Sequence, residues 1–124
     1  IQSVLSEVRP YLSEAEINAA KSAATIMAMN NIYYRFIHLV SDKSFAVMPA
    51  QLRMNVIANP GIDKLDFELS CLAVSAINGC GMCIDTHTHT LVKHGVSKLA
   101  IQSSIRIASV LNAAAMGIEI ADQS

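Results

Sequence analysis

The residues with the clearest chemistry are two cysteines separated by two residues, Cys80 and Cys83, at the predicted start of a helix. Three residues of helical rise and turn bring two thiols close enough to form a disulfide. A free cysteine thiol has a pKa of about 8.5. The N-terminus of a helix lowers this pKa and stabilises the thiolate, which is the nucleophilic form. The pair therefore predicts thiol-disulfide chemistry.

A histidine and a glutamate are placed to assist these thiols. At roughly 100° per residue, Cys80, Cys83 and His87 fall within an arc of about 60° on one face of a helix. Glu68 lies in an apolar run on the preceding predicted helix, where a buried carboxylate is costly unless it is paired or used. We predict that His87 is a base or cation beside the thiols and that Glu68 supplies a carboxylate across the turn. The alternatives are a surface position for His87 and an exposed one for Glu68.

Two other interpretations of the cysteine pair remain open. The first is that Cys80 and Cys83 are structural thiols on a packed helix, although the flanking glycines indicate an open site unlike a core. The second is a zinc site, because Cys-x-x-Cys followed by His87 and His89 resembles zinc-ligand spacing. His89 lies about 160° from His87 around a helix, so one helix does not offer all four side chains to one ion. We therefore expect no bound metal.

Other reactive or aromatic side chains have simpler predicted roles. Cys71 lies among apolar residues and is expected to be a small core residue. His94 is predicted to lie in the last turn of its helix, where a cation is favoured. The segment Tyr33-Tyr34-Arg35 is expected to line either a pocket or a subunit interface, and the sequence does not decide between them.

The elements that must position these residues are all predicted helices. Ser13, with Glu16 three residues later, predicts a capping box for a helix that runs to about Val40 and is weakened at Asn30-Asn31. The other predicted helices, two of them capped by Asp63 and Ser97, cover about residues 51–58, 63–77 and 80–94, and a final helix starts at residue 97 and includes residue 115. No segment has the alternating pattern of a strand. We therefore predict an all-α fold, with about five or six helices in one compact domain over residues 1–124.

Composition limits the class of protein. The chain has 124 residues, of which 52% are hydrophobic and 15% are charged, and this balance suits one domain with a substantial core. So much apolar surface on a small chain also suggests a buried subunit interface. A formal net charge of −1 and scattered basic residues argue against nucleic-acid binding.

The expected cellular location is inferred from the lack of membrane-spanning and signal-peptide patterns and from the number of cysteines. No uninterrupted apolar run approaches the roughly 20 residues of a membrane-spanning helix, and no signal-peptide pattern is visible. Three cysteines, an odd number, disfavour a secreted disulfide framework and favour reduced thiols. We expect a cytoplasmic protein without membrane partners. Since the chain begins with Ile1 in helical sequence, we also expect that a native N-terminal region is missing.

Four residues of the expected redox site carry a resemblance to a known family: Glu68, Cys80, Cys83 and His87. With the surrounding residues 67–80, they closely resemble the alkylhydroperoxidase D (AhpD) family, part of the wider carboxymuconolactone-decarboxylase-like superfamily. Segments 27–35 and 53–61 also look like AhpD sequence. The resemblance covers most of the chain from about Ala23 onward, and family members carry a longer N-terminal helical region.

The resemblance implies an all-helical homotrimer that runs a peroxidase-linked disulfide cycle. It implies that Cys83 is the nucleophile and Cys80 its resolving partner. Glu68 and His87 would form a proton relay. No bound cofactor is implied; the expected reductant is the lipoyl group of a lipoyl-bearing protein, and the expected protein partner is an AhpC-like peroxiredoxin. Met82 is a departure, because AhpD members can carry a histidine between the two cysteines.

We therefore predict an antioxidant thiol-disulfide oxidoreductase that reduces hydroperoxides and is reduced by a dithiol such as dihydrolipoamide. One alternative is a decarboxylase or lactone enzyme of the same superfamily. Another is a non-catalytic oligomeric scaffold that binds a partner through its apolar surface. Decarboxylase members commonly do without a cysteine pair, so Cys80 and Cys83 argue against the first alternative.

Overall fold

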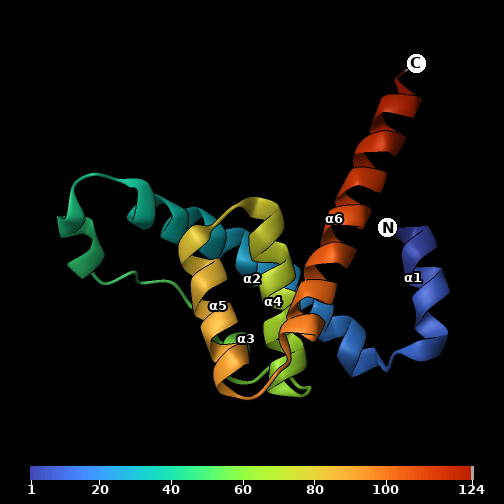
Figure 1. Cartoon of the computed structure of the whole chain (residues 1–124), viewed down its shortest axis with the longest axis horizontal. Helices are drawn as coiled ribbons and strands as arrows, with labels where there is room; N and C mark the ends of the chain where they lie inside the picture. The colour runs from blue at the N-terminus through green and yellow to red at the C-terminus, as the bar shows by residue number, and fades with distance from the viewer. Residues whose placement is uncertain (124) are drawn as a thin grey trace.

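Six α-helices and two short 3-10 turns make up the chain in the computed structural model, which describes residues 1–123 (Figure 1). In chain order they are α1 (Gln2–Val8), η1 (Arg9–Tyr11), α2 (Glu14–Leu39), η2 (Lys43–Val47), α3 (Asn55–Ala58), α4 (Lys64–Asn78), α5 (Gly81–Lys93) and α6 (Lys98–Asp122). No strand occurs among the described residues, so the predicted all-α fold is confirmed.

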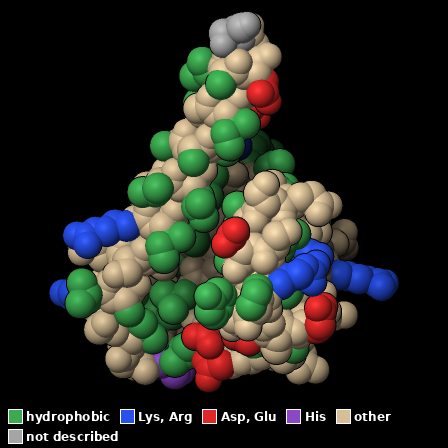
Figure 2. Space-filling view, turned by 90° about the vertical axis from the view of Figure 1, so that its right-hand side faces the viewer, with side chains coloured by type: hydrophobic (Ala, Val, Ile, Leu, Met, Phe, Trp, Pro, Cys, Tyr) green, Lys and Arg blue, Asp and Glu red, His purple; other side chains and the backbone are tan. Residues whose placement is uncertain are grey.

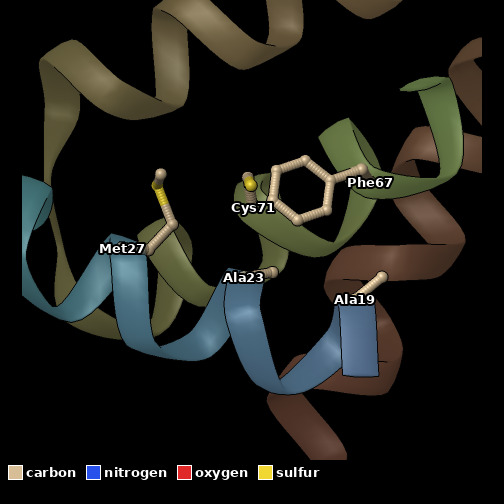
Figure 3. Packing of buried hydrophobic residues seen from close by; sticks show 5 residues of the cluster. All are labelled: Ala19, Ala23, Met27, Phe67 and Cys71. Carbon is tan, nitrogen blue, oxygen red and sulfur yellow. The ribbon is translucent and has the colours of Figure 1, made fainter. Parts of the chain in front are cut away.

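The core forms where α2 packs on α4 (Figure 3). Ala19, Ala23 and Met27 recur every four residues along one face of α2, and this face meets Phe67 and Cys71 of α4. The alanines let the two helices approach closely, and complete burial of a side chain such as Phe67 contributes about 1.5–3 kcal/mol. Because α4 also contacts α5 and α6, it is the central helix of the fold.

The predicted helix starts are confirmed by their side-chain caps. Ser13 and Glu16 form a reciprocal capping box, in which each side chain accepts a hydrogen bond from the backbone N–H of the other, at 3.1 and 2.9 Å. Asp63 accepts from the N–H of Leu65 at the start of α4, and Ser97 caps α6 in the same way. These caps fix where α2, α4 and α6 begin.

Two local predictions are wrong. The short helix expected over residues 51–58 covers only Asn55–Ala58, because Gln51 has a positive φ of 56° that breaks helical geometry. The expected weakening at Asn30-Asn31 does not interrupt α2, because both amides are buried and Asn31 is hydrogen-bonded to α4. Tertiary hydrogen bonds therefore outweigh the low helix propensity of asparagine.

Helix α6 leaves most of its apolar surface uncovered. Its C-terminal half extends beyond the other helices (Figure 1), and hydrophobic side chains follow its length in Figure 2. Ala108 is its only fully buried residue, whereas large exposed side chains include Leu99, Ile107, Val110, Leu111, Met116, Ile118 and Ile120. Although the sequence contains no uninterrupted apolar run of roughly 20 residues, α6 is long and apolar enough on average to cross a membrane, on length and composition alone.

Candidate functional site

The turn between α4 and α5 places both cysteines. Gly79 ends α4 in the left-handed conformation, with a φ of 72° that favours glycine. Cys80 follows as the N-cap of α5, and its backbone N–H donates to the carbonyl of Ser75 at 3.2 Å. Its Sγ accepts a hydrogen bond from the N–H of Cys83 at 3.3 Å, so the first sulfur lies at the amide-rich start of the helix.

Cys80 and Cys83 are joined by a disulfide, with Cα atoms 5.3 Å apart. The sequence prediction that these two sulfurs approach each other on one helix edge is therefore confirmed. The two thiols differ in access, because Cys80 is completely buried and Cys83 is 6% exposed. An incoming reagent reaches Cys83 first.

Glu68 and His87 form a buried pair beside the disulfide. Nδ1 of His87 lies 2.6 Å from Oε2 of Glu68, and both side chains are about nine-tenths buried. The alternatives of a surface position for His87 and an exposed one for Glu68 are therefore excluded. A carboxylate that accepts from Nδ1–H holds the imidazole in one orientation and leaves Nε2 as the nitrogen that exchanges protons.

A cavity of about 250 Å³ opens onto the reactive side of this pair. It is lined by Tyr34, Met82, Cys83, Thr86 and His87. The cavity thus brings together the more exposed sulfur and the imidazole, while Glu68 and Cys80 lie behind them. For residues 33–35 the sequence left open whether they line a pocket or a subunit interface. Tyr34 lines this pocket, and its ring packs edge-on against that of Tyr33.

Helix α2 contributes two features that sequence reasoning missed. The backbone carbonyl of Asn30 lies 3.9 Å from Sγ of Cys83, and its side-chain Oδ1 is a buried oxygen without a hydrogen-bond partner in the described chain. Asn30 and Tyr34 are four residues apart and so lie on the same face of α2. This four-residue spacing was the sequence signal for a shared face. It does not show that the face contacts α5, because that depends on how the helices pack.

A second hydrogen-bond network, with Asn31 and Ser75 buried within it, joins α2 to the end of α4. Nδ2 of Asn31 donates to Oγ of Ser75 at 2.9 Å, and Nδ2 of Asn78 donates to Oδ1 of Asn31 at 3.0 Å. Arg35 donates to the carbonyl of Asn78 at 2.7 Å. Because Ser75 and Asn78 flank the turn that leads to Cys80, this network fixes the position of the redox turn.

The third cysteine lies in the core as predicted. Cys71 is fully buried, and burial together with the nearby Glu68 carboxylate raises the pKa of its thiol to about 12. A thiol with so high a pKa stays protonated and unreactive at neutral pH.

The remaining histidines are separate from the redox site. His89 is exposed, unlike Cys80, Cys83 and His87, so the four residues of the zinc alternative are not gathered around one point. Within residues 1–123, no group of three or more His, Cys, Asp and Glu side chains is arranged to hold a metal ion. His94 caps the end of α5, with Nδ1 donating to the carbonyl of Thr90 at 2.8 Å, as its predicted place in the last turn requires.

Known proteins resemble this chain over most of its length. Residues 44–119 match the model of the carboxymuconolactone decarboxylase family. The chain is 60% identical over 119 residues to the alkyl hydroperoxide reductase AhpD of Rhodopseudomonas palustris (strain BisA53), covering 96% of this chain and 66% of the relative. It is 62% identical over 112 residues to AhpD of Coxiella burnetii (strain RSA 493 / Nine Mile phase I), covering 90% and 63%.

A third relative, AhpD of Brucella abortus (strain 2308), is 55% identical over 121 residues, covering 98% of this chain and 69% of the relative. The chain thus spans about two thirds of the length of the curated relatives that it matches. The matched part of the family model contains the whole of the disulfide turn, α5 and the glutamate of α4.

Proposed function

We propose that this chain, which belongs to the AhpD branch of the carboxymuconolactone decarboxylase family, is a thiol-disulfide oxidoreductase. Its proposed reaction is the reduction of alkyl hydroperoxides. The observation that carries the proposal is the Cys80–Cys83 disulfide at a pocket shared with His87. A two-electron thiol cycle needs two cysteines that can close into a disulfide and a nearby group, such as an imidazole, that exchanges protons.

The oxidising half of the cycle begins at the more exposed sulfur. The Cys83 thiolate attacks one peroxide oxygen, the O–O bond breaks, and the alkoxide takes a proton and leaves as the alcohol. Cys83 is then a sulfenic acid. The Cys80 thiol attacks this sulfur, water leaves, and the disulfide closes. The two cysteines lose two electrons in all, and the peroxide gains them as alcohol and water.

The reducing half needs an external dithiol. One thiolate of a compound such as dihydrolipoamide attacks the disulfide and forms a mixed disulfide. The second thiol of the reductant then displaces the protein sulfur, so the reductant leaves as a cyclic disulfide and both cysteines regain their protons. The lipoyl group is therefore a substrate of this step, and the protein needs no resident cofactor for it.

His87 and Glu68 are the proposed proton relay. His87 lines the pocket beside Cys83, and its Nδ1 is held by the Glu68 carboxylate. Nε2 is thus left to take the proton of the Cys83 thiol and to return it to the leaving alkoxide. Burial of the pair excludes water, which strengthens this hydrogen bond and keeps the imidazole aligned.

The protein partners and the oligomeric state are also part of the proposal. An AhpC-like peroxiredoxin would pass electrons or oxidising equivalents through the Cys83 pocket, and a lipoyl-bearing protein would supply the dithiol. We propose a homotrimer, because the exposed apolar surface of α6 suits burial against other copies of the chain. We also propose a cytoplasmic location, because three cysteines, an odd number, favour reduced thiols over a secreted disulfide framework.

Peroxide turnover with dihydrolipoamide as reductant tests the proposal. The full chain should consume an alkyl hydroperoxide, and Cys83→Ser should abolish this consumption, whereas Cys71→Ala should retain it. Mass spectrometry after peroxide treatment should show a reversible loss of two hydrogens confined to the peptides that hold Cys80 and Cys83. Full turnover by Cys83→Ser would contradict the role assigned to this sulfur. Alkylation of the thiols should also abolish turnover. The function of a decarboxylase or of a scaffold would not depend on free thiols and should survive alkylation.

A further inference from the structure

A second imidazole lies against the redox turn. His38 is in the last turn of α2, and its ring packs on Gly81, the residue directly after Cys80. A β-carbon placed on Gly81 would lie 3.0 Å from Cε1 and 3.1 Å from Nδ1 of His38. These distances are shorter than ordinary van der Waals contact, so the ring occupies the space that glycine leaves free. A side chain at this position would displace the imidazole from the backbone between the two cysteines by a few tenths of an ångström.

The contact is the third in a series along one face of α2. Asn30, Tyr34 and His38 are spaced by four residues, so they lie in successive turns on the same side of the helix. Asn30 contacts Sγ of Cys83, and Tyr34 lines the pocket with Cys83. His38 continues this line to the N-terminus of α5, so this face of α2 forms one wall of the redox site.

The charges around His38 differ from those around His87. His87 is paired with the Glu68 carboxylate, so the positive charge that it gains on protonation is offset by a negative one. No ion pair joins His38 to a carboxylate within residues 1–123. The His38 side chain is exposed, so solvent partly screens a positive charge on its ring, and no directly bound counter-charge in the described chain offsets it.

A lysine is in direct contact with the C-terminal end of α2. From η2, Nζ of Lys43 donates to the carbonyls of His38 and Val40. On α2 itself, Arg35 is held by the end of α4. The nearby carboxylates are Asp42, which is engaged with Ser44, and the exposed Asp85 of α5.

We propose that His38 is an electrostatic positioning residue of the redox pair, whose protonated ring stabilises the thiolate that forms when the Cys80–Cys83 disulfide opens. The inference rests on the proposed thiol cycle and adds to it a group from a different helix. A cation beside a helix N-terminus favours the thiolate over the thiol. Met82, between the cysteines, carries no charge, and the imidazole that lies against Gly81 comes from α2.

The test is the alkylation rate of the reduced full chain as a function of pH, with each cysteine followed by mass spectrometry. His38→Gln keeps a polar side chain of similar size and removes the charge. The pKa of the more reactive thiol should rise. Because the charge at the exposed His38 is partly screened, the alkylation rate at a pH below that pKa should fall about two- to ten-fold. His38→Lys, which restores a positive charge, should recover most of the lost rate.

Two further variants separate charge at this place from other effects. Gly81→Ala keeps His38 but displaces its ring, so it should raise the thiol pKa in the same direction and by less. His89→Gln removes an exposed imidazole elsewhere on α5 and should leave the profile unchanged. Circular dichroism should show the same helix content in every variant.

An unchanged profile in His38→Gln, or an equal shift in His89→Gln, would overturn the inference. Failure of His38→Lys to recover the rate would do so too, since shape rather than charge would then be responsible. The proposed function fails separately, if the wild-type chain shows no thiol-dependent peroxide turnover. A shifted profile in His38→Gln would then still establish the effect of His38 on the thiols.

Discussion

Nδ1 of His87 and Oε2 of Glu68 lie 2.6 Å apart across the α4–α5 interface, although 19 residues separate them in the sequence. The pair is buried, so its hydrogen bond is not screened by water. His87 lines the pocket that exposes Cys83, whereas Glu68 is not among the lining residues. This arrangement allows proton transfer to be tested separately from sulfur chemistry.

The first prediction concerns the carboxylate of this pair. Glu68→Gln keeps the side-chain volume but removes the charge that orients and stabilises the His87 imidazolium. Peroxide turnover should fall on the order of 100-fold, the range that a positioned acid–base group contributes. The assay is steady-state turnover with dihydrolipoamide. Asp66→Asn, at an exposed position on the same helix, is the matched control and should retain turnover. Equal losses in both variants would show that the helix rather than the relay is affected.

The second prediction concerns the selectivity of thiol labelling. At about pH 8, a thiol with a pKa of about 12 is ionised to only about one part in ten thousand. Iodoacetamide added to the reduced native chain should therefore label Cys83 and spare Cys71, and denaturant should make Cys71 reactive. Rapid labelling of Cys71 in the native chain would mean that this region opens readily.

The same thiol predicts a pH dependence of stability. Folding raises the pKa of Cys71 from its ordinary value of 9.0 to about 12, so the folded state holds this proton more tightly than the unfolded state. The stabilisation is fully present below pH 9.0 and is lost as the pH rises from there toward 12. Urea denaturation of the reduced chain at a series of alkaline pH values measures this loss. Cys71→Ala should make the slope in this window shallower, and an unchanged slope would contradict the assignment.

The fourth prediction concerns the network before the redox turn. Asn31→Ala removes the bonds to the fully buried Ser75 and the half-buried Asn78. The free energy of unfolding should fall by about 1–3 kcal/mol for each group left unpaired. Asn112→Ala, at an exposed site on α6, should change it by less than about 0.5 kcal/mol. Denaturant titration of both variants decides whether the network holds the turn.

The fifth prediction concerns assembly through α6. Val110→Glu places a charge on the exposed apolar surface of this helix and should shift the protein toward smaller species in analytical ultracentrifugation. Asn112→Glu adds the same charge about 200° around the helix, on a different face. It should leave the assembly state less affected. A monomer in the unaltered chain would contradict the proposed trimer.

The sequence by itself determined where α2, α4, α5 and α6 begin, their caps and the redox pair, because these depend on interactions within a few residues. The Ser13–Glu16 capping box and the spacing of Cys80 and Cys83 are local, and both occur in the structure as predicted. Membership of the family also follows from local motifs that persist along most of the chain.

Only the tertiary structure decided which distant side chains meet these motifs. Periodicity placed Glu68 on the preceding helix, but the packing of α4 on α5 brought its carboxylate to His87. Low propensity at Asn30 and Asn31 predicted a weak point, whereas burial against α4 and α5 made that stretch a continuous wall of the site. His38 has no local signal, because its contact with Gly81 depends on the angle and separation of two helices. Local energies fix the elements, and the burial of apolar faces fixes how those elements meet.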